Sequence, residues 1–101
     1  MIHITGQVCE VTVRDGDSAE QKEILLKNIG EALRFPSYYG QNLDALADCL
    51  SDLEWLPIAA VTLVIYKFNR LSSDLQTSLI DVFRDSETSH KPRKLTVVVF
   101  D

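Results

Sequence analysis

Three aspartates at helical spacing form the pattern in this chain that most favours chemistry or binding. Asp44, Asp48 and Asp52 recur every four residues, shortly after a pair of tyrosines, Tyr38 and Tyr39. Like charges four residues apart on a helix repel by about 0.2–0.5 kcal/mol per pair, and Asp is a mediocre helix former. Because such a face opposes its own helix, we interpret it as a binding surface.

Carboxylates can also serve catalysis or hold a metal. Asp44 and Asp48 could form an acid/base pair, but adjacent turns of one exposed helical face indicate no cleft. A divalent cation prefers carboxylate oxygens. However, three aspartates in a single row extend over about 12 Å, so they cannot surround one ion. We therefore expect no metal, no cofactor and no carboxylate catalysis.

The cysteines offer a third kind of chemistry. Cys9 or Cys49 could pair with His3 or His90 as nucleophile and base. Cys49 falls inside a predicted helix, however, and His90 lies in a polar segment. Free cysteine is most often a small buried residue. We expect no enzymatic activity, and an enzyme that uses Cys49 remains a competing hypothesis.

Size and charge narrow the classes of function. The 101 residues predict one domain over 1–101, with a hydrophobic fraction of 46% that suffices for a core. The net charge of −5 argues against direct binding of nucleic acid and favours a basic partner. Neither a signal peptide nor a membrane-spanning stretch is evident, so we expect a soluble cytoplasmic protein with free thiols.

The first part of the chain predicts a strand followed by a helix. Val11-Thr12-Val13 is β-branched throughout, and Gly6 divides this region into two short strands or marks a bulge. Ser18 is the expected N-cap of the helix, with Gln21 at capping-box spacing. Phe35-Pro36 is expected to end that helix, since the residue before proline leaves the α region.

The second helix carries the aspartates. Asn42 is a favourable N-cap for a helix from about Leu43 to Leu53. At 100° per residue the helix has an apolar stripe and an adjacent polar sector. The stripe consists of Leu43, Leu46, Leu50 and Leu53, and the polar sector of Asp44, Asp48, Ser51 and Asp52.

The remaining segments complete an α/β pattern. Val61–Tyr66 and Leu95–Phe100 are nearly continuous apolar runs, which predict strands buried on both faces. Ser72 or Ser73 is expected to cap a helix between them, and residues 86–93 to form a loop. The order β-α-α-β-α-β predicts a mostly parallel sheet of at least three strands.

The acid row has little to neutralise it. No Lys or Arg occurs from Phe35 to Tyr66. The helix dipole favours Asp44 in the first turn but opposes Asp52 in the last. Tyrosine is a favoured anchor at protein interfaces, so the pair at 38–39 supports an interaction surface.

One segment resembles a known family. In order it contains Tyr38-Tyr39-Gly40-x-Asn42-Leu43-Asp44-Ala45-Leu46-x-Asp48-Cys49-Leu50. This motif resembles the barstar family, intracellular inhibitors of barnase-type ribonucleases. The resemblance implies a three-stranded parallel sheet flanked by helices. It also implies an inhibitor, monomeric when free, whose acidic helix and preceding loop fill the cationic active site of a basic, extracellular-type ribonuclease.

The resemblance further implies which residues bind the partner. Asp48 would pair with the phosphate-binding cations of the enzyme, Asp44 with basic groups beside them, and Tyr38 would stack over the active-site mouth. Gly40 and Asn42 would shape the loop. The complete implied site consists of Tyr38, Tyr39, Gly40, Asn42, Asp44, Asp48, Ser51, Asp52 and Asp85.

Three positions depart from the family pattern. Ala47 and Leu53 replace tryptophans, and Asp52 stands where the family has glycine. Lost aromatic area together with an added charge indicates a different or more basic target surface. An alternative hypothesis follows, in which the chain keeps the fold but binds a basic partner that is not a nuclease.

Overall fold

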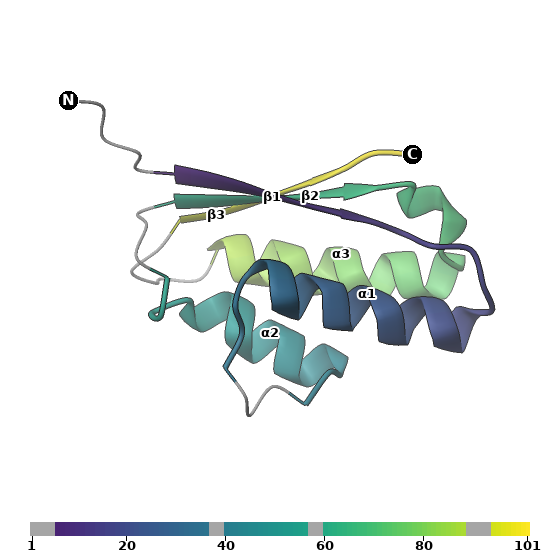
Figure 1. Ribbon diagram of the computed structural model, residues 1–101, viewed down its shortest axis with the longest axis horizontal. Coiled ribbons are helices and arrows are strands. Elements are labelled where there is room, and N and C mark those ends of the chain that lie inside the picture. The colour runs from purple at the N-terminus through teal and green to yellow at the C-terminus, as the bar shows by residue number, and fades with distance from the viewer. Residues whose placement is uncertain (1–5, 37–39, 57–59, 89–93) are drawn as a thin grey trace.

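The computed structural model describes residues 6–36, 40–56, 60–88 and 94–101 (Figure 1). Within these ranges the elements follow the predicted order β-α-α-β-α-β, with one short 3-10 helix inserted before the last helix. They are β1 (Gly6–Thr12), α1 (Ser18–Ala32), α2 (Leu43–Asp52), β2 (Ala60–Tyr66), η1 (Phe68–Arg70), α3 (Ser73–Thr88) and β3 (Lys94–Val99).

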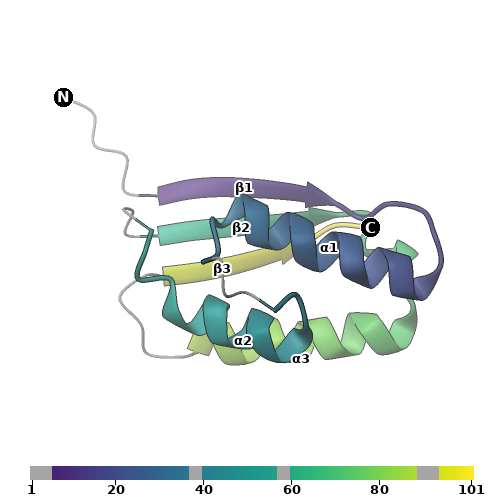
Figure 2. The same ribbon diagram turned by 60° about the horizontal axis from the view of Figure 1, so that its bottom comes forward.

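The sheet is parallel, with β2 in the centre and β1 and β3 on either side. Cys9 of β1 and Val97 of β3 both lie opposite Leu63. All three α-helices lie on the same side of the sheet (Figures 1 and 2). Helix α1 packs on β1 and α3 on β3, whereas α2 packs mainly against α3, beside which it lies. The predicted α/β class with a three-stranded parallel sheet is therefore confirmed.

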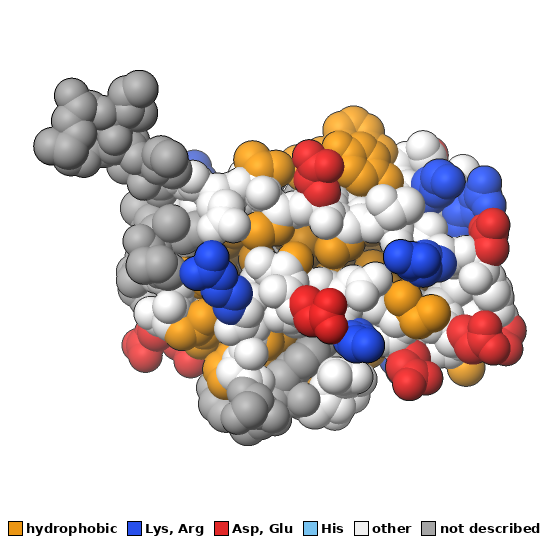
Figure 3. Space-filling model, in the orientation of Figure 1, with side chains coloured by type: hydrophobic (Ala, Val, Ile, Leu, Met, Phe, Trp, Pro, Cys, Tyr) orange, Lys and Arg blue, Asp and Glu red, His pale blue; other side chains and the backbone are white. Residues whose placement is uncertain are grey.

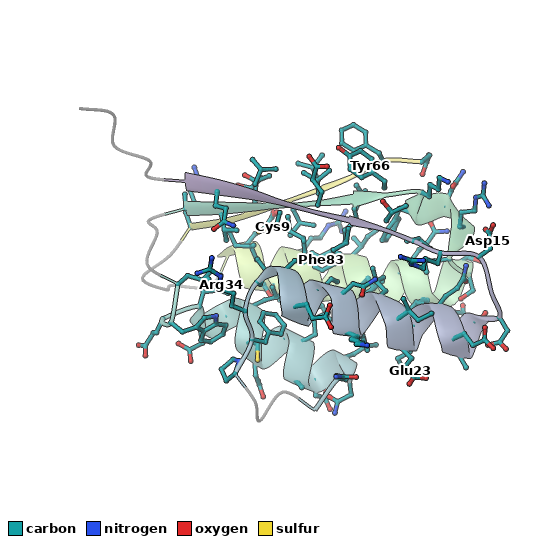
Figure 4. All side chains as sticks on the ribbon, in the orientation of Figure 1. Cys9, Asp15, Glu23, Arg34, Tyr66 and Phe83 are labelled. Carbon is teal, nitrogen blue, oxygen red and sulfur yellow. The ribbon has the colours of Figure 1, made fainter. Side chains whose placement is uncertain are left out.

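The core lies between this sheet and the helices. Figure 4 shows Cys9 of β1 and Phe83 of α3 pointing into that layer, and both are buried. Leucine and isoleucine fill most of it. The fully buried side chains include Leu26, Ile29, Leu33, Leu46, Leu50, Leu53, Leu63, Ile65 and Leu79. The apolar stripe of α2 thus faces the core, as its spacing predicted.

The opposite face of the sheet is open among the described residues, which corrects one prediction. Val61–Tyr66 is mostly buried, but Leu95–Phe100 is not, because of its residues only Leu95 is buried. Phe100 is 50% exposed and stacks on Tyr66, with ring centroids 5.5 Å apart. Orange side chains on the upper side of Figure 3 and the position of Tyr66 in Figure 4 show this face. An apolar run predicts a strand, but it does not reveal how many layers of helix cover it.

Three predicted boundaries also need correction. Asp17, not Ser18, caps α1, because its carboxylate accepts the Glu20 N–H at 2.9 Å. Helix α1 ends at Ala32, before Phe35, and Leu33 is its C-cap. Helix α3 continues through Thr88, so the polar residues from position 86 onward are not all loop. Polar composition alone did not distinguish a last helical turn from a loop.

The start of α3 agrees with the prediction. Of the two serines proposed as its cap, Ser72 accepts the Leu75 N–H at 3.3 Å. Within the ranges described, no helix is long and apolar enough to cross a membrane.

Candidate partner-binding site

Helix α2 begins where the sequence predicted, at Asn42. The side-chain Oδ1 of Asn42 accepts the Ala45 N–H at 2.8 Å, and its backbone carbonyl accepts the Leu46 N–H at 2.8 Å. Leu46 and Leu50 are fully buried. The cap sets the start of the helix and the leucines set its rotation, so together they determine which side chains face outward.

The three aspartates form one row on this helix. Asp44, Asp48 and Asp52 all lie within the unbroken span of α2, and successive members are about 6 Å apart along the axis. Asp44 and Asp48 are exposed, and Asp52 is half-buried. Figure 3 shows acidic side chains beside the C-terminal end of α2. The predicted acid row therefore exists as a geometric feature.

The helix itself gives this row little compensation. The first turn contains Asp44, which the positive end of the helix dipole stabilises. The last turn contains no basic residue, and there Asp52 meets the negative end of the dipole. Glu54, exposed just beyond the helix, adds another negative charge that our sequence reasoning did not include. Every charged residue that α2 itself carries is therefore negative.

Cys49 lies on the buried side of the same helix, with 4% of its surface exposed. Burial raises the pKa of the Cys49 thiol, and the negative charges of Asp48 and Asp52 raise it further. The nucleophile in cysteine catalysis is the thiolate, which a raised pKa disfavours. The geometry therefore supports a buried structural residue and not a catalytic Cys49.

The end of the preceding loop depends on a glycine. Gly40 is exposed, and a Cβ at this position would approach Nδ2 of Asn42 to 3.1 Å. Gln41 adopts a left-handed conformation with φ 53°. A larger residue at Gly40 would thus press on the side chain that caps α2. Tyr38 and Tyr39 lie outside the described residues.

The remaining predicted residues belong to α2 and α3. Ser51 is half-buried near its C-terminal end. Asp85 is exposed on α3, the helix against which α2 packs most extensively. Among the described residues, no three His, Cys, Asp or Glu side chains group together as metal ligands would.

One contact beside the site was not predicted from the sequence. The indole Nε1–H of Trp55 donates to the carbonyl of Leu33 at 2.9 Å. The indole ring also meets Phe35 edge-on, with ring centroids 5.8 Å apart and planes at 85°. Trp55 is the only tryptophan in the chain, and it follows the last residue of the acidic helix by three positions. A single tryptophan so close to the end of the acidic helix was the feature of the sequence that could have indicated this contact.

The fold and the site define a small α/β domain that presents an anionic, N-capped helix. Comparison with known proteins is consistent with this class. Residues 9–101 match the family model for Barstar, described as barnase inhibitor, and the chain belongs to this family. It is also 35% identical over 80 residues to "Putative ribonuclease inhibitor YrdF" of Bacillus subtilis (strain 168), covering 76% of this chain and 85% of that protein.

Proposed function

We propose that this chain inhibits a basic ribonuclease by presenting the α2 carboxylates to the enzyme's cationic active site. The observation that carries the proposal is the row of Asp44, Asp48 and Asp52 on one capped helix with no basic residue in its last turn. The family description and the name of the Bacillus subtilis relative support this class of target. A ribonuclease binds RNA phosphates through cationic groups, which a row of carboxylates can engage instead.

Asp48 is the proposed centre of the contact. It lies one helical turn from Asp44 and one from Asp52, so it experiences repulsion from both. A cation bound at Asp48 therefore relieves two unfavourable interactions, whereas a cation at either end of the row relieves one. Binding to a positively charged surface should also be fast at low salt, because opposite charges steer the encounter.

The other predicted residues have supporting roles in this proposal. Gly40 and Asn42 fix the start of α2, and Ser51 on α2 and Asp85 on α3 would extend the contact with the enzyme. Tyr38 and Tyr39 would supply the aromatic contact that the family resemblance implies. The protein would act as a monomer in the cytoplasm, where it would protect the producing cell from its own nuclease.

A second candidate partner is a basic protein that is not a nuclease. Leu53, where the family has tryptophan, is fully buried and contributes to the core. Ala47, which replaces the family's other tryptophan, is small and half-buried. The described part of the α2 surface thus lacks both aromatic side chains, which favours a target with a different or more basic surface.

An inhibition assay with purified proteins tests the proposal. The secreted basic ribonucleases encoded in the source genome would be titrated with the chain, with cleavage of a fluorogenic RNA as the readout. We expect Asp48→Ala to weaken inhibition by more than about 100-fold and Asp44→Ala by less. Asp74→Asn, an acid on the first turn of α3, is the matched control for charge and should leave inhibition unchanged.

Salt provides an independent measurement. Raising the ionic strength should slow association steeply and change dissociation much less. If Asp48→Ala inhibited as well as the unaltered chain, the proposed mechanism would be wrong. If no basic ribonuclease were inhibited but a basic protein without nuclease activity bound through Asp48, the second candidate would be correct.

A further inference from the structure

Trp55 connects the ends of the two helices that flank the proposed binding loop. It follows α2 by three residues, and its indole donates to Leu33, the C-cap of α1. The last carbonyls of a helix have no intrahelical partner, so this hydrogen bond satisfies a group that would otherwise need water. The edge-on contact with Phe35 adds a second attachment on the same side.

The turns that end α1 and α2 each contain a residue with a strained, left-handed backbone. Arg34 leaves α1 with φ 56°, and Leu53 leaves α2 with φ 55°. Residues with a Cβ adopt this left-handed conformation at a cost, and the surrounding structure must hold them there. Trp55 contacts the residues on both sides of Arg34 and is two residues from Leu53. The contacts of Trp55 with Leu33 and Phe35 thus form a brace, which ties the segment after α2 to the turn at the end of α1.

The packing of α2 is unequal on its two flanks, so an added contact on the weaker flank affects its orientation. Helix α2 packs more extensively against α3 than against α1. The smaller contact with α1 holds the helix less firmly on that flank. The bridge from Trp55 to Leu33 and Phe35 attaches α2 on its other flank, close to the C-terminal end where Asp52 lies.

We infer that Trp55 is a positioning residue, which holds α2 at a fixed orientation to α1 and so aligns the acid row for its partner. This inference rests on the proposed function of that row. Without the brace, α2 would sample several orientations, of which only a fraction can bind. The apparent affinity falls by that fraction, and the loss appears mainly in the association rate.

Two variants separate the parts of the brace without altering an acid. Trp55→Phe keeps an aromatic ring but removes the N–H donor, and Phe35→Leu keeps an apolar side chain but removes the edge-on ring. We expect each to slow association with the inhibited ribonuclease about three- to tenfold, with dissociation nearly unchanged. Asp48→Ala should mainly speed dissociation, because it removes a contact within the complex.

Ile65→Val controls for general loss of stability. Ile65 is fully buried in β2, and the substitution should weaken the fold to a similar extent. Amide hydrogen exchange supplies a readout that needs no partner. Exchange in the last turn of α2 should quicken in Trp55→Phe and Phe35→Leu under conditions where Ile65→Val leaves it unchanged.

These measurements distinguish failure of the inference from failure of the proposed function. The inference is wrong if Asp48→Ala weakens inhibition while both brace variants associate at the normal rate. It is also wrong if Ile65→Val slows association equally, because the role would then be purely structural. If Asp48→Ala has no effect, the proposed function fails. In that case amide hydrogen exchange in the last turn of α2 tests the inference by itself. Faster exchange in Trp55→Phe and Phe35→Leu supports it, and unchanged exchange in both variants overturns it.

Discussion

Replacing Asp48 with Asn should stabilise the free protein, although we expect it to impair binding. Asp48 has a like charge four residues before it and another four residues after it on α2. At about 0.2–0.5 kcal/mol per pair, loss of both repulsions should raise the free energy of unfolding by about 0.4–1 kcal/mol. Asn and Asp have similar helix propensities, so the substitution changes little else in the helix.

The matched control removes a negative charge from a position where that charge stabilises the fold. Asp74 lies in the first turn of α3, where the helix dipole favours an acid. Asp74→Asn should therefore lower the free energy of unfolding by about 0.3–1 kcal/mol. Each variant removes one negative charge from a net charge of −5, so any effect of overall charge is common to both.

Urea unfolding at low and high salt measures both effects. In 10 mM salt the two variants should move in opposite directions from the unaltered chain. In 1 M salt the Debye length is about 3 Å, shorter than the spacing of about 6 Å along the row, so the gain from Asp48→Asn should nearly vanish. A loss of stability in Asp48→Asn, or a gain that salt does not reduce, would refute the view that the row opposes its own helix.

Three further predictions concern the support of the site. Asn42→Ala should lower the free energy of unfolding by about 1 kcal/mol because the Ala45 N–H loses its acceptor, and Asn42→Asp should retain most of the stability in urea unfolding. Leu50→Ala should cost about 2–5 kcal/mol by the same measurement, and a loss below 1 kcal/mol would show that α2 is loosely packed. Burial raises the pKa values of Cys9 and Cys49, so the folded state holds these protons more tightly. This stabilisation should be complete below the unfolded thiol pKa of about 8.5 and fall as pH rises above it. Native thiols should accordingly label slowly with a disulfide reagent and quickly in urea, whereas rapid native labelling of Cys49 would reopen a catalytic role.

The helix that carries the site could be predicted closely because several local signals agree. Asn42 caps α2, the leucines at positions 46, 50 and 53 are buried, and the aspartates lie in one row. Capping, apolar spacing and charge each depend on residues within a few positions of one another. Where such signals coincide, the sequence determines both the limits of the helix and its rotation.

The tertiary features could not be predicted in the same way. The apolar run from Leu95 to Phe100 looks like a buried strand, yet Phe100 is half exposed because no helix in the described ranges covers that face. The hydrogen bond from Trp55 to Leu33 joins residues 22 positions apart. Both features depend on how elements are placed in space, and neither periodicity nor composition records that placement.

The row and its support explain how one short helix can tolerate an unfavourable surface. Repulsion within the row costs α2 about 1 kcal/mol or less, whereas each buried leucine of α2 contributes about 2–5 kcal/mol as judged by truncation. The stabilisation from the buried leucines therefore exceeds the repulsion between the aspartates several-fold. Helix α2 can thus retain its charges for binding a partner. Asp44, Asp48 and Asp52 could all be neutralised without unfolding the chain. If that triple variant lost inhibition while its free energy of unfolding stayed equal or rose, the row would serve binding and not stability.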